Sequence, residues 1–159
     1  MEALYLRLFI AIIGFYADII GKAKESSCSH QKHQLNCVQF VYNYDGDSIK
    51  FNVPGVHPLF GRRLRVRLRG VDAPEIRAVD RCEKVLANKA RVFVTRRLEV
   101  ASRISLVSIG RSKFSYIIAD VVADGSSLSR DLLERKLAVP SYSSAKPKVD
   151  WCQYLDRRS

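Results

Sequence analysis

The stretch RLRVRLRGVDAPE, residues 63–75, says most about the fold of this chain. Its arginines alternate with leucine and valine, so an extended strand over residues 63–71 has one cationic face and one apolar face. Asp72-Ala-Pro-Glu75 breaks the alternation, because the residue before a proline avoids the helical conformation and the proline lacks a backbone donor. The stretch therefore predicts a strand of a half-buried sheet that ends in two carboxylates.

The neighbouring segments predict a hairpin before this strand and a helix after it. The turn Asp45-Gly46-Asp47 separates the expected strands at residues 39–44 and 48–53. Further on, the patterns predict a helix at 79–97, strands at 98–109 and 114–122 joined by a turn at 110–113, and a helix at 128–136. This order predicts an α+β, mainly β fold. It suits a five-stranded OB-fold Greek-key barrel with a helix between strands 3 and 4 and a C-terminal helix.

The two ends of the chain differ in character from this domain. Residues 1–23 are mostly apolar and predict a signal peptide or an N-terminal membrane anchor, with an ordinary core helix as the alternative. Residues 24–37 are polar and predict a linker, residues 38–152 form the expected domain, and residues 153–159 form a tail. We therefore expect an exported protein, either periplasmic, secreted or anchored in the envelope, that associates with the membrane if the segment is retained.

The charge of the chain favours a polyanionic partner. The 159 residues include 27 Lys and Arg against 16 Asp and Glu, a net charge of +11. Nucleic acid is the first expectation and an anionic membrane the second. A basic protein with no polyanionic partner is the alternative. The hydrophobic content of 47% argues against a disordered chain.

The four cysteines, behind an export-like segment, indicate disulfide bonds. Four cysteines allow three connectivities, and the sequence leaves the choice open. Of the three, we favour Cys28 with Cys37 and Cys82 with Cys152. A zinc site involving His30 and His33 is a weaker alternative, because their spacing matches no common ligand pattern.

Two acidic clusters and one arginine suggest a metal site that also holds phosphate. Asp47 and Asp72 would come from separate strand ends, and hard divalent cations such as Ca²⁺ prefer such oxygen ligands. Each cluster alone is equally consistent with a turn or a helix start. Arg67 lies on the polar face five residues before Asp72, where it can neutralise a phosphate held by the same metal. Glu75 could position or deprotonate an attacking water.

With these residues in this order, the chain resembles the staphylococcal nuclease-like, or thermonuclease, family. The resemblance covers about residues 38–152, and the Trp-Cys ending is similar to that of exported bacterial members. It implies a five-stranded OB barrel, monomeric, that cleaves DNA or RNA phosphodiesters with Ca²⁺. The motifs that carry it are YDGDS at 44–48, RVRLRGVDAPE at 65–75, Cys82-Glu83, Ala90, IADV at 118–121, Asp124-Gly125, Leu128, LAVP at 137–140 and Trp151-Cys152.

The resemblance also implies a role for individual residues. Asp47 and Asp72 would bind the metal through their carboxylates, and Ala73, where the family often has threonine, would bind it through its carbonyl. Arg67 would be the first phosphate-binding arginine, and Glu75 the general base. The residues that would contact the nucleic acid are Lys113, Phe114 and Tyr142.

The chain departs from the family pattern at Tyr116. The family has a second catalytic arginine here, and a tyrosine can donate a hydrogen bond but carries no positive charge at neutral pH. Arg111 is five residues too early to take its register. The sequence thus predicts a nuclease whose activity is reduced by Tyr116. The alternatives are an OB module that binds nucleic acid without cleaving it, and a membrane-tethered interaction protein.

Overall fold

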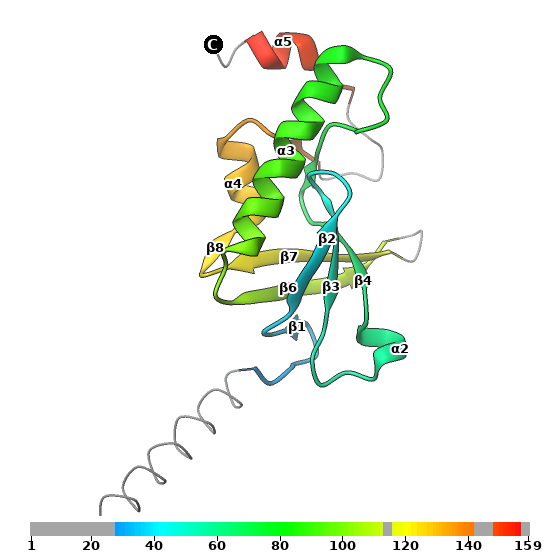
Figure 1. Cartoon of the computed structure of the whole chain (residues 1–159), viewed down its shortest axis with the longest axis vertical. Helices are drawn as coiled ribbons and strands as arrows, with labels where there is room; N and C mark the ends of the chain where they lie inside the picture. The colour runs from blue at the N-terminus through cyan, green and yellow to red at the C-terminus, as the bar shows by residue number, and fades with distance from the viewer. Residues whose placement is uncertain (1–27, 113–115, 142–147, 157–159) are drawn as a thin grey trace, which may run out of the picture.

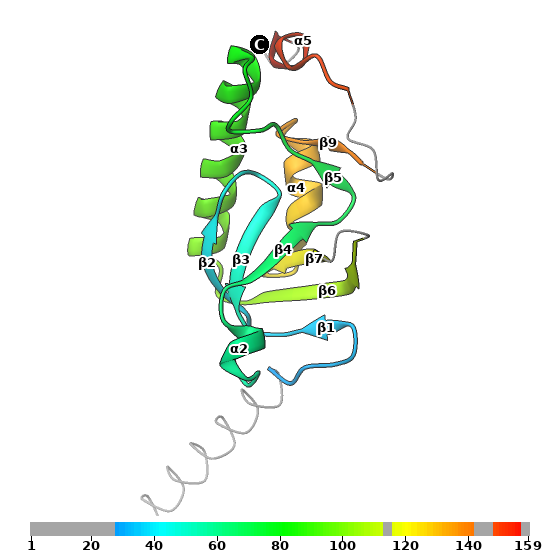
Figure 2. The same ribbon diagram turned by 90° about the vertical axis from the view of Figure 1, so that its right-hand side faces the viewer.

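The computed structural model describes residues 28–112, 116–141 and 148–156. Figure 1 shows a strongly bent sheet with the long helix α3 packed across it, and Figure 2 shows the shorter helix α4 beside α3, where it contacts β7 and β8. The fold is mixed α+β, mostly strands with one long helix. The N-terminal segment and the tail from residue 157 lie outside the described residues. Within the described residues, no helix is long and apolar enough to cross a membrane.

The first three main strands are β2 (Gln39–Asn43), β3 (Ser48–Asn52) and β4 (Leu64–Leu68). They form an antiparallel meander, as the sequence predicts, because their alternate apolar side chains share one buried face. Ile49, Phe51 and Val66 are fully buried there. A short helix, α2 (Pro58–Gly61), connects β3 to β4 and was not predicted.

The arginine strand is shorter than expected. It ends at Leu68, and Gly70 turns the chain with a φ of +76° that residues with a side chain rarely adopt. The next two residues form β5 (Val71–Asp72), which pairs with β9 (Val139–Pro140) in a separate two-stranded sheet. The single strand predicted over residues 63–71 is therefore corrected to two strands, and the turn between them redirects Asp72.

Helix α3 (Arg81–Glu99) begins where Asp80 caps it by accepting a hydrogen bond from the Glu83 N–H. Its buried stripe consists of Leu86, Ala87, Ala90, Val94 and Leu98. Of these, Ala90, Val94 and Leu98 belong to the main hydrophobic core together with the strands. The helix runs two residues beyond the predicted end because Leu98 continues this stripe. The strand predicted from residue 98 therefore begins only at residue 104.

The second half of the sheet comes from β6 (Ile104–Arg111) and β7 (Ile117–Ala123), which pair antiparallel. β6 extends through Arg111, into the turn predicted at residues 110–113. β7 also pairs with β4 in parallel, which joins the two halves. β8 (Ser126–Ser127) and the helices α4 (Leu128–Glu134) and α5 (Trp151–Asp156) complete the described elements.

The sheet follows the order β1-β6-β7-β4-β3-β2. Its five longest strands correspond to the five predicted ones. Barrel closure was also predicted, but among the described residues no pairing joins β1 to β2 at the two ends of this path.

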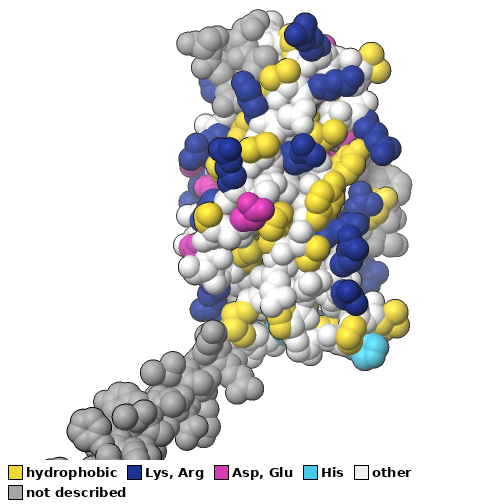
Figure 3. All heavy atoms as spheres, in the orientation of Figure 1, with side chains coloured by type: hydrophobic (Ala, Val, Ile, Leu, Met, Phe, Trp, Pro, Cys, Tyr) yellow, Lys and Arg dark blue, Asp and Glu magenta, His cyan; other side chains and the backbone are white. Residues whose placement is uncertain are grey.

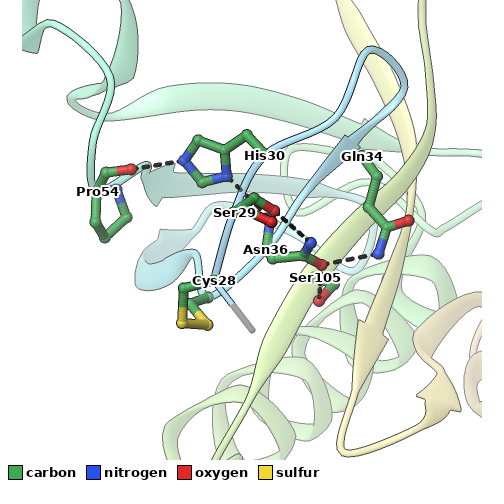
Figure 4. The surroundings of a disulfide bond; sticks show 8 residues. Cys28, Ser29, His30, Gln34, Asn36, Pro54 and Ser105 are labelled. Carbon is green, nitrogen blue, oxygen red and sulfur yellow. Dashed lines mark hydrogen bonds between the residues drawn. A yellow bond between two sulfur atoms is a disulfide. The ribbon is translucent and has the colours of Figure 1, made fainter. Parts of the chain in front are cut away.

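Residues 28–37, predicted as part of a linker, belong to the folded domain. β1 (Gln34–Leu35) pairs with β6, and a disulfide bond joins Cys28 to Cys37. Figure 4 shows how this loop is fixed: the Asn36 amide donates to the Ser29 carbonyl at 2.7 Å, and the His30 ring lies 2.6 Å from the Pro54 carbonyl. These contacts come from the polar side chains that made the stretch look like a linker.

The second disulfide joins Cys82, in the first turn of α3, to Cys152 in α5. Both bonds match the pairs favoured from the sequence. Trp151 is 6% exposed and packs in a small apolar cluster with Leu86 and Val139, so α5 is held against α3 by packing as well as by the bond.

Candidate metal and phosphate site

The turn between β2 and β3 is built to hold Asp47 in a buried position. The Asp45 carboxylate accepts hydrogen bonds from the backbone N–H groups of Asp47, at 3.1 Å, and Ser48, at 2.7 Å. Gly46 permits a close approach: a Cβ there would lie 2.8 Å from the Ala73 Cβ and 2.9 Å from the Ala90 Cβ. The turn therefore packs against both α3 and the segment after Asp72, and only glycine fits at its tip.

Arg67 brings the two predicted metal carboxylates together. Its Nη2 atom lies 3.0 Å from Asp47 Oδ2 and 2.8 Å from Asp72 Oδ1. Both aspartates are 2% exposed, whereas the Arg67 side chain is 40% exposed. The result is a buried acidic pair covered by one cation that solvent can reach.

Ala73 joins this group through its backbone. Its N–H donates to Asp47 Oδ2 at 3.1 Å, and the Asp47 carbonyl accepts from the Leu68 N–H at 2.8 Å. These bonds connect the β2–β3 turn to both sides of the bend at Gly70. Two segments that are distant in sequence, the turn and the bend, thus meet at one point.

The environment of Asp47 disfavours its negative charge. Burial is the main cause, repulsion from Asp45 is the second, and together they raise the pKa of Asp47 to about 7. Arg67 and the Ala73 N–H oppose this shift only in part. An additional cation beside Asp47 would favour the ionised form.

The donor set fits a hard divalent cation. Ca²⁺ takes six to eight oxygen ligands, mostly carboxylates, carbonyls and water. Asp47 and Asp72 are two buried carboxylates that could bind such an ion, and the Ala73 carbonyl could join them as a third ligand. Water or a phosphate oxygen would complete such a shell.

Glu75 lies at the start of the loop between β5 and α3, and its side chain is partly buried. Its N–H donates to Glu83 Oε1 at 2.9 Å, so the first turn of α3 fixes the position of this segment. Glu83 was not among the predicted site residues. The pattern of Asp80 followed three residues later by Glu83 is a capping signal that could have identified it.

Tyr116 lies just before β7, and its side chain is 46% exposed. The pairing of β4 with β7 places Arg67 opposite Ile118. Tyr116 precedes Ile118 by two residues, so its side chain is on the same face of the sheet as that of Arg67. The guanidinium of Arg65 lies over the Tyr116 ring, 5.4 Å from its centroid. The other predicted contacts with nucleic acid, Lys113, Phe114 and Tyr142, lie outside the described residues.

The remaining arginines of the strand have different surroundings. Arg69 donates to the Ser108 carbonyl at 2.6 Å and lies 4.0 Å from Asp120, which ties it to β6 and β7. Arg63 precedes β4 and has a φ of +55°. Arg65 and Arg67 are therefore the two arginines of β4 that point to the same open face beside the acidic pair.

Residues 65–156 match the model of the staphylococcal nuclease homologue family, which is more than half of the chain. A comparison with curated proteins gave no match.

Proposed function

Because the chain belongs to the staphylococcal nuclease homologue family, for which the OB-fold is typical, we propose that it is a Ca²⁺-dependent nuclease that hydrolyses phosphodiester bonds of DNA or RNA. Family membership supports a nuclease-type function and a nucleic-acid substrate in general terms. The assignment of the metal, the residues and the reaction rests on the site itself.

One observation carries this proposal: two buried carboxylates, Asp47 and Asp72, meet around one partly exposed arginine. A purely structural pair of this kind would be costly, since burying two negative charges beside one positive charge leaves an excess of negative charge. A divalent cation would remove that excess. It would also leave Arg67 able to turn its exposed guanidinium to a phosphate.

The residues then divide the chemistry between them. Bound Ca²⁺ would supply positive charge to a phosphate oxygen and polarise the phosphorus for attack. Arg67 would bind a second oxygen of the same phosphate and stabilise the charge that develops there. Glu75 would accept a proton from the attacking water at its carboxylate. The water oxygen would bond to phosphorus as the bond from phosphorus to the leaving oxygen breaks. A solvent water would protonate the leaving oxygen, and Glu75 would return its proton to the hydroxide left behind.

The setting of the enzyme follows from the same features. The net charge of +11 favours a polyanionic substrate, and two disulfide bonds favour an oxidising compartment. We therefore propose an exported monomer, periplasmic, secreted or held at the envelope through the N-terminal apolar segment.

A cleavage assay on the purified chain tests the proposal. Single-stranded DNA and RNA are incubated with Ca²⁺ or with a chelator, and the products are separated on a gel. We expect cleavage only with Ca²⁺, and its loss in Asp72→Ala and Glu75→Gln. Glu134→Gln, an exposed change on α4, is the matched control and should cleave like the wild type. Cleavage that persists in chelator, or in Asp72→Ala, would overturn the metal mechanism.

A second candidate function is binding without cleavage. Tyr116 favours it, because this uncharged residue stands where the resemblance implies a second catalytic arginine. This candidate predicts salt-sensitive binding to polynucleotides and no turnover with Ca²⁺. Turnover at ordinary nuclease rates would exclude it.

A further inference from the structure

We propose that a row of four side chains across the open face of the sheet, Tyr42, Lys50, Arg65 and Tyr116, binds single-stranded nucleic acid beside the metal site. The row has an aromatic residue at each end and two cations between them. The inference rests on the proposed function, because it names the form of the substrate and the surface that holds it. No residue of the row is a proposed metal ligand.

Strand register places the four residues side by side. Tyr42 of β2 is opposite Lys50 of β3, and Lys50 is opposite Arg65 of β4. β4 runs parallel to β7, with Val66 opposite Ile117. Arg65 and Tyr116 each precede these residues by one position, so they are also neighbours. Neighbouring strands are about 4.8 Å apart, so the row spans about 14 Å.

The side chains of this row point away from the core. Tyr42 is 43% exposed, and the next residue, Asn43, points the other way: its amide donates to the Arg91 carbonyl of α3 at 3.0 Å. Arg65 is exposed, while the following Val66 is fully buried. The row therefore lies on the face of the sheet opposite α3. On the side of the molecule that carries α3, Figure 3 shows Lys and Arg side chains next to hydrophobic ones with few acidic groups between them.

The surface is hollowed where the row crosses β2, β3 and β4. A pocket of about 170 Å³ is lined there by Tyr42, Tyr44, Ser48, Lys50 and Arg65. The arginine also stacks on Tyr116, so its guanidinium is held over the sheet and not free to extend into solvent. Arg65 and Tyr116 thus hold each other in place before any ligand arrives, which lowers the entropic cost of binding.

These groups suit a single strand better than a duplex. Proteins that bind single strands combine a cationic groove for the backbone with aromatic rings on which unpaired bases stack. In a duplex the bases are stacked on one another and cannot reach Tyr42 or Tyr116. Two phosphates over Lys50 and Arg65 and bases on the two rings would use the whole row.

The row leads directly to the proposed metal site. The next pair on the same face of the sheet is Ser48 opposite Arg67, and Ser48 Oγ donates to Asp47 Oδ1 at 3.2 Å. A strand that lies on Lys50 and Arg65 therefore has its neighbouring phosphate close to Arg67. The row would hold the substrate segment next to the bond that is cleaved.

Binding measured in chelator tests this inference without cleavage. Fluorescence anisotropy is recorded with a labelled 12-nucleotide oligo(dT) over a range of salt concentrations. In Lys50→Gln/Arg65→Gln we expect roughly tenfold weaker binding at 0.1 M salt. The slope of log K against log salt should fall by about 1.4, the value for two phosphate contacts on a single strand. Lys89→Gln/Arg96→Gln removes the same charge from α3 and should change the slope by less than half as much.

The aromatic ends have their own test. Tyr42→Leu and Tyr116→Leu keep apolar area but remove the stacking ring, and each should weaken oligo(dT) binding roughly 5- to 150-fold. A 12-base-pair duplex should bind more weakly than the single strand and respond little to these changes. The inference is overturned if the duplex binds as tightly, or if the row variants behave like the α3 control. The two proposals can fail separately. A protein that binds oligo(dT) through the row but never cleaves it would contradict the proposed nuclease function and leave this inference standing.

Discussion

Asp47 and Arg67 form an ion pair of 3.0 Å between a buried carboxylate and a guanidinium that is 40% exposed. The same arginine nitrogen also contacts Asp72, so one cation faces two buried acids. In the metal-free protein Arg67 offsets the charge of both. If a divalent cation offsets the two carboxylate charges instead, Arg67 becomes available to bind a phosphate. The stability and the activity of the protein are then linked through this one side chain.

The first prediction concerns that link. Arg67→Gln leaves Asp47 and Asp72 without their shared cation, and should lower the free energy of unfolding by about 1–3 kcal/mol in chelator. This lies below the value for a fully buried pair because water already reaches Arg67. Saturating Ca²⁺ should remove most of the difference. Urea denaturation in both conditions measures it, with the exposed Arg81→Gln as control. An equal loss with and without Ca²⁺ would argue against a metal at this site.

The second prediction concerns pH. Burial raises the pKa of Asp47 to about 7, from 3.8 in the unfolded chain, so the folded protein binds more protons between these values. The contribution of Asp47 to stability must therefore fall as pH rises from about 4 to 7, by an amount on the order of a few kcal/mol. Thermal melts in chelator should show that Asp47→Asn loses less stability over this range than the wild type. Ca²⁺ should stabilise the wild type most above pH 7 and leave Asp47→Asn unchanged. A parallel pH profile for the two proteins would contradict the prediction.

The third prediction concerns the missing charge. Hydrogen bonds between the Tyr116 backbone and Ser112 hold Tyr116 at the start of β7, so Tyr116→Arg should place a cation on the face that carries Arg67. If the site lacks only that charge, kcat should rise roughly 10²-fold or more. Single-turnover cleavage with Ca²⁺ measures the change, and Tyr116→Leu should show no gain. An unchanged kcat in Tyr116→Arg would mean that the surrounding residues have no use for a second arginine.

The fourth prediction compares the two disulfide bonds. Cys82–Cys152 closes a loop of 70 residues and Cys28–Cys37 a loop of 9. Loop entropy alone predicts a loss of about 4 kcal/mol when the first is removed by a Cys→Ser pair, and about 2.5 kcal/mol for the second. Chemical denaturation of the two double variants measures the order. A larger loss from the short loop would show that native contacts around His30 and Asn36 outweigh the chain entropy.

Several features of the molecule follow from local sequence alone. The alternation of arginine with leucine and valine gives β4 its two faces, and the spacing of Leu86, Ala90 and Val94 gives α3 its buried stripe. The Asp-Gly-Asp turn and the acids after Gly70 identify the candidate site. Such features depend on side-chain periods of two and 3.6 residues and on turn chemistry, which a short stretch of chain carries by itself.

Other features depend on contacts between distant segments, and only the tertiary structure decides them. Pairing of β5 with β9 ends the arginine strand at Leu68, and pairing of β1 with β6 draws the supposed linker into the domain. Arg67 bridges Asp47 and Asp72 because the β2–β3 turn packs on Ala73 and α3. The pKa of Asp47 and the row from Tyr42 to Tyr116 likewise exist only once four strands are in register. The sequence names the reacting groups, and long-range packing sets their burial, their charge and their distance from one another.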